Sequence, residues 1–230
     1  GYSRHLYEFK DEYANMPVDV QKDEEKGLYY VQKEKKRLYF RKSTPAKKIQ
    51  KYYRALSMEQ DRRSPHHYFN SVKEVTGKVF VDVGCAEGYS SLEIIEEAKH
   101  VYLFEQDEQW LEAIRATFEP WQDKVTIVQK YVSDHNSSRE QTLDDFFNNQ
   151  TNEHLFLKMD IEGAERHALA GCNNLFQNCQ KLDFAICTYH LRDDEEVISA
   201  FLDKHNCTYI NQKGFFRHKI RSVVMRGSKK

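Results

Sequence analysis

Several features that mark whole classes of proteins are missing from this chain. In 230 residues, no apolar run approaches the roughly 20 residues that a membrane-spanning helix needs. The formal net charge is −1, whereas proteins that bind nucleic acid generally carry a basic excess. The sequence also contains no internal repeat and no low-complexity tract. We therefore expect a globular protein with no membrane span and no nucleic-acid partner.

Cysteines are few, odd in number and without the C-x2-C spacing of metal sites. The five thiols are Cys85, Cys172, Cys179, Cys187 and Cys207. We expect them to be reduced, as in a cytoplasmic protein. The first ten residues, GYSRHLYEFK, also lack the apolar core of a signal peptide, which agrees with a cytoplasmic location.

The first 77 residues differ in composition from the rest and are crowded with Tyr, Lys and Arg. GLYYVQ (27–32) and RLYFRK (37–42) flank a charged turn and predict a β-hairpin with Tyr-rich faces. PAKKIQKYYRALSMEQD (45–61) has apolar residues near helical spacing and predicts a helix. We expect residues 1–77 to form a cap that contacts substrate or a second subunit of a homodimer.

From residue 78 onward, apolar strands alternate with helices, and the connections are short. Strands are predicted at 79–84, 101–107, 125–134, 155–160, 182–190, 207–214 and 220–227. Helices are predicted at 89–98, 108–121, 142–149, 162–172 and 193–205. This order indicates an α/β fold: a doubly wound, mostly parallel seven-stranded sheet, Rossmann-like. Because the last two strands, joined through FFRHK (215–219), have no helix between them, the final strand should be antiparallel. Residues 78–230 would form one domain.

The first strand of this region ends in VDVGCAEGYSS (81–91), where Asp82 is followed by Gly84 and Gly88. Glycines after a strand let the backbone turn sharply and approach a ligand. The spacing is not the G-x-G-x-x-G of dinucleotide sites, and no P-loop lysine follows. Triphosphate binding is therefore not expected.

The next two strands also end in polar residues, Glu105 and then Ser133 with Asp134. Since ligands of open α/β sheets bind beyond the carboxyl ends of the strands, these positions matter for function. A carboxylate such as Glu105 can accept hydrogen bonds from both ribose hydroxyls, and Ser133 and Asp134 could read an adenine amino group. Acidic ribose recognition without a pyrophosphate loop favours S-adenosylmethionine (SAM) over NAD.

At this point the chain resembles the FkbM-type SAM-dependent O-methyltransferases. The resemblance covers roughly residues 78–190, and its most specific part is LFLKMDIEGAE (155–165). It implies the methyltransferase fold with a hairpin ending the sheet, and methylation of hydroxyls on sugars or glycosylated natural products. One departure is GCAEG (84–88), where many members carry GANIG or similar. The predicted cofactor contacts are Asp82, Gly84, Cys85, Glu87, Gly88, Tyr89, Glu105, Gln106, Ser133, Asp134 and Asp160.

Methyl transfer to oxygen requires a positioned acceptor and removal of its proton. Asp160 ends the fourth strand and His190 ends the fifth, so one hydroxyl could meet both side chains. We predict His190 as general base, with Asp160 orienting it or contacting the cofactor. Glu162 is a further catalytic candidate, although it and Glu165 also suit the first turn of a helix, where acids complement the macrodipole.

A divalent cation held by Asp160 with Glu162, Glu165 or His190 is an alternative that this sequence does not favour. The fifth strand ends in TYH, which is short of the oxygen ligands that hard cations prefer. We therefore predict no metal site.

Before the first strand, RRSPHHY (62–68) could fold over the site. Its Arg63, His66, His67 and Tyr68, together with Glu165, are candidate substrate contacts. Ten Lys or Arg against one Glu between residues 33 and 54 indicate either a solvated face or a phosphate-bearing partner.

Our interpretation is a SAM-dependent O-methyltransferase acting on a sugar hydroxyl, with a small-molecule or glycan acceptor. Two other functions are open: an NAD-binding oxidoreductase, and a non-catalytic binding or scaffold module. The first requires a dinucleotide glycine loop, which the sequence lacks. The second predicts a lost set of strand-end residues, yet Asp82, Glu105, Asp134, Asp160 and His190 are all present.

Overall fold

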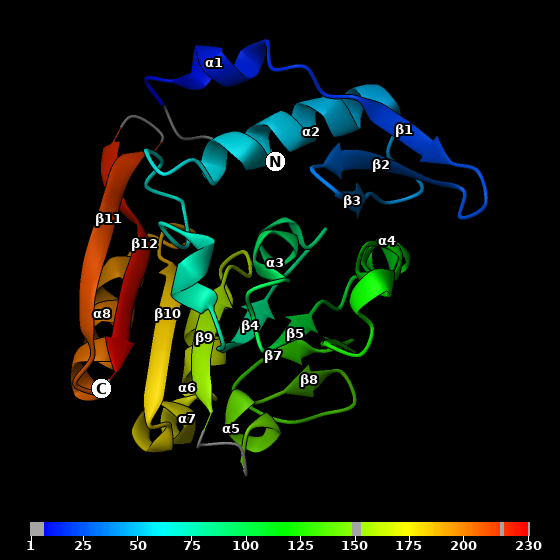
Figure 1. Ribbon diagram of the computed structural model, residues 1–230. Coiled ribbons are helices and arrows are strands. Elements are labelled where there is room, and N and C mark those ends of the chain that lie inside the picture. The colour runs from blue at the N-terminus through cyan, green and yellow to red at the C-terminus, as the bar shows by residue number, and fades with distance from the viewer. Residues whose placement is uncertain (1–6, 149–152, 217–218, 230) are drawn as a thin grey trace.

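A computed structural model describes residues 7–148, 153–216 and 219–229 (Figure 1). Its main feature is a seven-stranded sheet in the order β11-β12-β10-β9-β4-β5-β6. The strands are β4 (Val79–Val83), β5 (His100–Phe104), β6 (Val125–Val128), β9 (His154–Met159), β10 (Lys181–Cys187), β11 (Thr208–Phe216) and β12 (Lys219–Lys229). The five strands β10, β9, β4, β5 and β6 are parallel, and β12 runs antiparallel to both of its neighbours. The predicted fold class, including the antiparallel last strand, is confirmed.

The strand order reverses beside β4, which pairs with β5 on one side and β9 on the other. From β4 the chain proceeds outward to β5 and β6, then returns to β9 and continues to β10. The carboxyl ends of β4 and β9 are therefore neighbours, with Val83 opposite Met159. In open α/β sheets, ligands bind at such a switch point.

Helices cover both faces of the sheet. They are α1 (Lys10–Ala14), α2 (Ala46–Glu59), α3 (Tyr89–Ile94), α4 (Glu108–Phe118), α5 (Leu143–Phe146), α6 (Glu165–Ala170), α7 (Asn173–Asn178) and α8 (Asp194–Lys204), with 3-10 turns η1 (Val72–Val75) and η2 (Glu119–Trp121). One buried cluster joins α3 and α4 to the sheet, and a second joins α5 to α8 to the opposite face. Because both faces are covered, every residue of β4 is buried, including Asp82.

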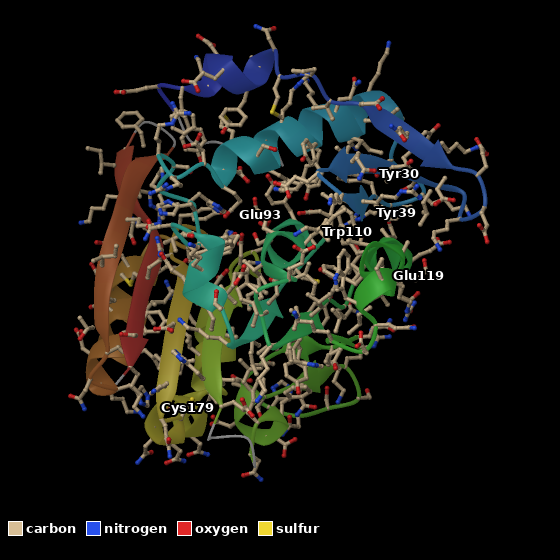
Figure 2. All side chains as sticks on the ribbon, viewed as in Figure 1. Tyr30, Tyr39, Glu93, Trp110, Glu119 and Cys179 are labelled. Carbon is tan, nitrogen blue, oxygen red and sulfur yellow. The ribbon has the colours of Figure 1, made fainter. Side chains whose placement is uncertain are left out.

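The N-terminal region forms a separate three-stranded antiparallel sheet, β1 (Val20–Asp23), β2 (Leu28–Lys33) and β3 (Lys36–Tyr39). It contains the predicted Tyr-rich hairpin, with the Tyr30 and Tyr39 rings 5.3 Å apart (Figure 2). Helix α2 lies above the main sheet (Figure 1). Phe40 and Ile49 join the same buried cluster as Leu92 of α3, so this region packs against the face of the sheet that α3 and α4 cover.

Two local predictions were wrong, and one helix was missed. The strand predicted at 125–134 is broken: β6 ends at Val128, and β7 (Tyr131–Val132) pairs instead with β8 (Glu140–Gln141) in a separate parallel pair. A tight turn, in which Lys130 N–H donates to the Val128 carbonyl, separates the two strands. The helix predicted from residue 162 begins only at Glu165, because Glu162 and Gly163 have φ of 56° and 105°. Helix α7 was not predicted.

Three parts of these predictions lie outside the described residues: residues 217–218 of the FFRHK connection, residue 149 of the helix predicted at 142–149, and residues 1–6 of the cap. None of the helices in the described ranges combines the length and apolar character that crossing a membrane requires. All five cysteines are free thiols, as expected.

Candidate active site

A cavity of about 1380 Å³ lies at the carboxyl ends of β4, β5, β9 and β10, under α2. Most of the predicted site residues line it: Asp82, Gly84, Cys85, Glu87, Tyr89, Glu105, Gln106, Ser133, Asp134, Asp160, Glu162, His66, Tyr68 and His190. Gly88, Glu165, Arg63 and His67 do not. Single-ligand pockets usually span about 300–1,000 Å³, so this cavity has room for a cofactor and an acceptor together.

The glycine turn after β4 makes the closest approach in the site. Gly84 has φ +78°, and a Cβ there would lie 2.1 Å from the Asp160 carbonyl oxygen. Only glycine allows this contact, which brings the ends of β4 and β9 together. Gly88 has φ +82° and ends the turn against the Phe118 ring, so its role is to shape the backbone before α3.

Asp82 holds this turn from inside the protein. Its Oδ2 accepts a hydrogen bond from Ser91 at 2.6 Å, and its Oδ1 lies 2.8 Å from Lys158 Nζ. The same ammonium donates to the Gly84 carbonyl at 2.7 Å. Burial disfavours the charged form of Lys158, but Asp82 and Asp160 outweigh it and raise the pKa of this lysine. Sequence reasoning missed Lys158, although a lysine inside an apolar strand is itself a signal.

Glu105, at the end of β5, is bound by backbone donors on both sides. Its Oε2 accepts from Ala86 N–H at 3.0 Å and its Oε1 from Asp107 N–H at 2.8 Å. These contacts fix the carboxylate against the glycine turn while it still lines the cavity. Ala86 has φ +47°, a left-handed conformation that the bond to Glu105 helps to hold.

Asp134 has two histidine partners that sequence reasoning did not identify. Its Oδ1 lies 2.7 Å from His135 Nδ1 and its Oδ2 lies 3.3 Å from His167 Nδ1. Hydrogen bonding to these two rings lowers the pKa of Asp134 to about 2. Ser133 is buried beside it, and Ser133, Asp134, His135 and His167 all line the cavity.

His190, which also lines the cavity, lies among three carboxylates. Its Nδ1 is 2.8 Å from Glu165 Oε1, and its Nε2 is 3.5 Å from Asp160 Oδ1 and 3.8 Å from Glu162 Oε2. Neither ring nitrogen makes a hydrogen bond of standard geometry with the described residues. Burial favours the neutral ring, but Glu165, Asp160 and Glu162 together outweigh it and raise the pKa of His190 to about 9.

Glu165 sits behind His190 rather than in the cavity. It is fully buried, and its two oxygens accept the N–H groups of Ile161 and Gly163 at 2.9 and 3.0 Å. This carboxylate therefore fixes the turn after β9 and faces the imidazole. Its position fits a residue that orients His190, not the predicted substrate contact.

Two residues from the segment before β4 reach Asp160. Tyr68 donates its hydroxyl to Asp160 Oδ2 at 2.7 Å, and His66 Nε2 lies 3.9 Å from the same oxygen. His66 Nε2 is also 3.0 Å from the hydroxyl of Tyr189, which sequence reasoning missed. Burial lowers the pKa of His66 to about 4, so its ring is neutral at pH 7. Asp160 thus joins the cap segment to the strand ends.

The remaining two predicted substrate contacts lie elsewhere. His67 is buried, with Nδ1 at the Ser64 carbonyl and Nε2 accepting from Arg226 at 2.9 Å. Arg63 is at the surface and pairs with Glu12 and Asp61. Their side chains are engaged in these contacts and do not line the cavity.

Helix α2 forms the roof. Tyr52 donates its hydroxyl to Glu87 Oε2 at 2.7 Å, and its ring stacks on Trp110 at 6.3 Å. Trp110 lies beneath α2 at the start of α4 (Figure 2), and the Arg41 guanidinium covers its ring at 4.0 Å. The roof is therefore anchored both to the glycine turn and to α4.

Within the described residues, Asp160, Glu165 and His190 lie close enough together to hold a metal ion, as do His66, Asp160 and Cys187. Both groups depend on Asp160, which already accepts from Tyr68. Both Glu165 oxygens are also bound by backbone N–H groups. Two carboxylates that would attract a cation, Asp160 and Glu165, already favour a proton on His190.

Comparison with known proteins gives one family and a shared fold. The family described as "Methyltransferase FkbM domain" matches residues 83–210, more than half of the chain. Comparison with curated proteins gave no match.

Two solved structures illustrate the fold. The methyltransferase FkbM of Methylobacillus flagellatus KT is 19% identical, with 66% of this chain and 43% of that chain covered and a TM-score of 0.53. This chain thus spans less than half the length of that protein. The magnesium protoporphyrin IX methyltransferase of Synechocystis PCC 6803, solved with bound SAM, is 12% identical, with 82% and 86% covered and a TM-score of 0.50. The similarity to both structures lies in the methyltransferase fold, with its Rossmann-like sheet. The family match, with this fold, shows that the chain belongs to the FkbM methyltransferase domain family.

Proposed function

We propose that the protein is a SAM-dependent O-methyltransferase whose acceptor is a hydroxyl of a sugar. The observation that carries this proposal is the arrangement at the switch point of the sheet. There, the Gly84 turn, Asp160 and His190 all line one cavity. Family membership supports methyl transfer over the oxidoreductase and scaffold alternatives.

The cavity has the features that SAM requires. Gly84 leaves no Cβ between the turn and the Asp160 backbone. In this proposal, the Glu105 carboxylate binds the ribose, and Ser133 and Asp134, which line the same cavity, contact the adenine. When bound there, SAM would supply an electrophilic methyl group. Gln106, Cys85 and Tyr89 complete the proposed contacts, as they line the same wall.

The chain's own residues would manage the proton of the acceptor. Glu165 faces Nδ1 of His190, which leaves Nε2 directed toward Asp160 and the cavity. A base must be neutral, yet the surrounding carboxylates favour the protonated ring. A positive charge bound in the cavity lowers the pKa of a nearby imidazole. We therefore propose that His190 becomes a base when the cationic cofactor is bound, with Asp160 orienting the ring and the acceptor.

The acceptor side suits a polyhydroxylated ligand. Tyr68 and Tyr189 supply aromatic surface, and Asp160 and Glu162 supply carboxylates that accept from sugar hydroxyls. Arg41 and Lys48 line the cavity under the roof and could bind a phosphate on an activated sugar. In this proposal, residues 1–77 act as a cap over the acceptor, and contact with a second copy of the chain is a further role for them.

Two measurements test the proposal in order. Calorimetric titration with S-adenosylhomocysteine (SAH) should give binding, and its absence would reject the cofactor assignment. A methyl-transfer screen of activated sugars, run with and without chelator, should then find an acceptor. Full activity in chelator would exclude the metal alternative. Binding of SAH without transfer to any hydroxyl compound would favour the scaffold alternative.

A further inference from the structure

Glu87 is a buried carboxylate that has no cationic partner among the described residues. It is 4% exposed, lies in the glycine turn and lines the cavity under α2. Its Oε2 accepts from the Tyr52 hydroxyl at 2.7 Å. Across the described parts of the chain, no lysine, arginine or histidine lies within ion-pair distance of it. The other deeply buried acid of this wall, Asp82, has Lys158 at 2.8 Å.

A carboxylate in this setting is electrostatically incomplete. Removing a charge from water costs several kcal/mol unless an opposite charge or sufficient hydrogen bonds replace the water. Burial raises the pKa of Glu87 even though Tyr52 and nearby backbone N–H groups oppose the shift. A cationic group entering the cavity would therefore gain from contact with this side chain. The carboxylate faces the space where a ligand would lie, and Tyr52 keeps it there.

This inference rests on the proposed function, which decides the cation that would bind near Glu87. Glu105, Ser133 and Asp134 mark the adenosine part of the cavity, and Asp160 marks the acceptor part. The space between the glycine turn and α2 is left for the amino-acid moiety of SAM, which carries an ammonium and a carboxylate. Ser90, at the start of α3, also lines this space, and its hydroxyl makes no hydrogen bond to the residues that the structure describes.

We propose that Glu87, held in place by Tyr52, binds the ammonium group of the cofactor's amino-acid moiety. The Ser90 hydroxyl is then available to the carboxylate of the same moiety. The roof helix α2 is thereby part of the cofactor site, because its Tyr52 fixes the residue that pairs with the ligand. The protein should accordingly distinguish ligands with the amino-acid moiety from ligands without it.

Two ligands separate this role from a structural one. SAH carries the ammonium, whereas 5′-methylthioadenosine keeps the adenosine and lacks the whole amino-acid moiety. Calorimetry on wild type, Glu87→Gln, Tyr52→Phe and Glu105→Gln would compare both ligands. Glu87→Gln should weaken SAH binding about tenfold to a hundredfold, the range for a hydrogen bond to a charged group, and change 5′-methylthioadenosine binding less than about twofold. Tyr52→Phe should show the same selectivity with a smaller loss.

Glu105→Gln is the matched control, because both ligands contain the ribose and both should weaken together. Retained 5′-methylthioadenosine binding by Glu87→Gln also shows that the variant is folded. Equal losses for both ligands, or unchanged SAH binding, would overturn the assignment of Glu87. Wild-type protein that binds neither ligand would instead overturn the proposed function itself, so the two failures are distinct.

Discussion

Replacing Glu165 with Gln should lower the pKa of His190 by more than one unit. The Glu165 carboxylate is fully buried and its Oε1 lies 2.8 Å from His190 Nδ1. The folded protein raises the pKa of His190 from 6.5 to about 9. That difference corresponds to about 3 kcal/mol of preferential stabilisation of the protonated ring. An opposite charge at this distance changes a pKa by about 1–3. Glu165 therefore accounts for a large share of the raised pKa of His190.

The assay is an NMR titration of the imidazole signals between pH 5 and 10, with His190→Gln used to assign the resonance. Glu162→Gln is the matched control, because it also removes a carboxylate near the ring. Its side chain is 93% exposed and its Oε2 is 3.8 Å from Nε2, so solvent screens the charge. We expect Glu162→Gln to shift the pKa of His190 by only a few tenths of a unit, on the scale of exposed charge pairs.

The same pair should give protein stability a defined pH dependence. The pKa of His190 is higher in the folded than in the unfolded chain, so its contribution is complete below about pH 6.5. The contribution is lost as pH rises through about 9. Urea denaturation at pH 6 and pH 9.5 should therefore show a larger difference in unfolding free energy for wild type than for His190→Gln. A wild-type His190 pKa at or below 6.5, or one unchanged by Glu165→Gln, would refute this reasoning.

Three further changes test the supports of the site. Lys158→Met should destabilise the fold by about 3–5 kcal/mol in chemical denaturation, because Asp82 is left as an unpaired buried charge. The double variant with Asp82→Asn should recover part of this loss in stability. Gly84→Ala should lower the free energy of unfolding by more than about 2 kcal/mol and abolish SAH binding, since its Cβ would meet the Asp160 carbonyl oxygen. Near-normal stability of this variant would contradict the close approach. Tyr68→Phe should lower the free energy of unfolding by about 1.5–3 kcal/mol, because the Asp160 carboxylate loses a hydrogen bond. An unchanged midpoint of thermal or urea unfolding would argue that water replaces the hydroxyl.

Much of the fold follows from patterns within short segments. The run Val79–Val83 is almost wholly apolar because helices cover both faces of its strand, and its burial agrees with that prediction. The helix predicted at 142–149 likewise forms as α5, and the Thr142 side chain caps its start by accepting from Asp145 N–H. These features depend on interactions between residues a few positions apart, so local reasoning finds them.

Other features of the fold were not predicted from the sequence, and the reason can be identified. The apolar run 125–134 looks like one strand, but Val132 pairs with Gln141 and not with the main sheet. Glu162 looks like the first residue of a helix, but a left-handed turn precedes α6. In both places, the backbone follows partners that lie elsewhere in the chain, and periodicity carries no information about them.

The sequence by itself determined the family, the order of the seven strands of the main sheet, and the acidic strand ends Asp82, Glu105 and Asp160, because chain order and local spacing encode them. Only the tertiary structure decided which charges are paired. Lys158 neutralises Asp82, Glu165 faces His190, and Tyr52 of the roof binds Glu87. Each of these contacts joins residues on different elements, and burial gives them their strength by removing the water that would otherwise screen the charges. The site residues can thus be identified from the sequence, whereas their protonation states and their separate roles depend on packing.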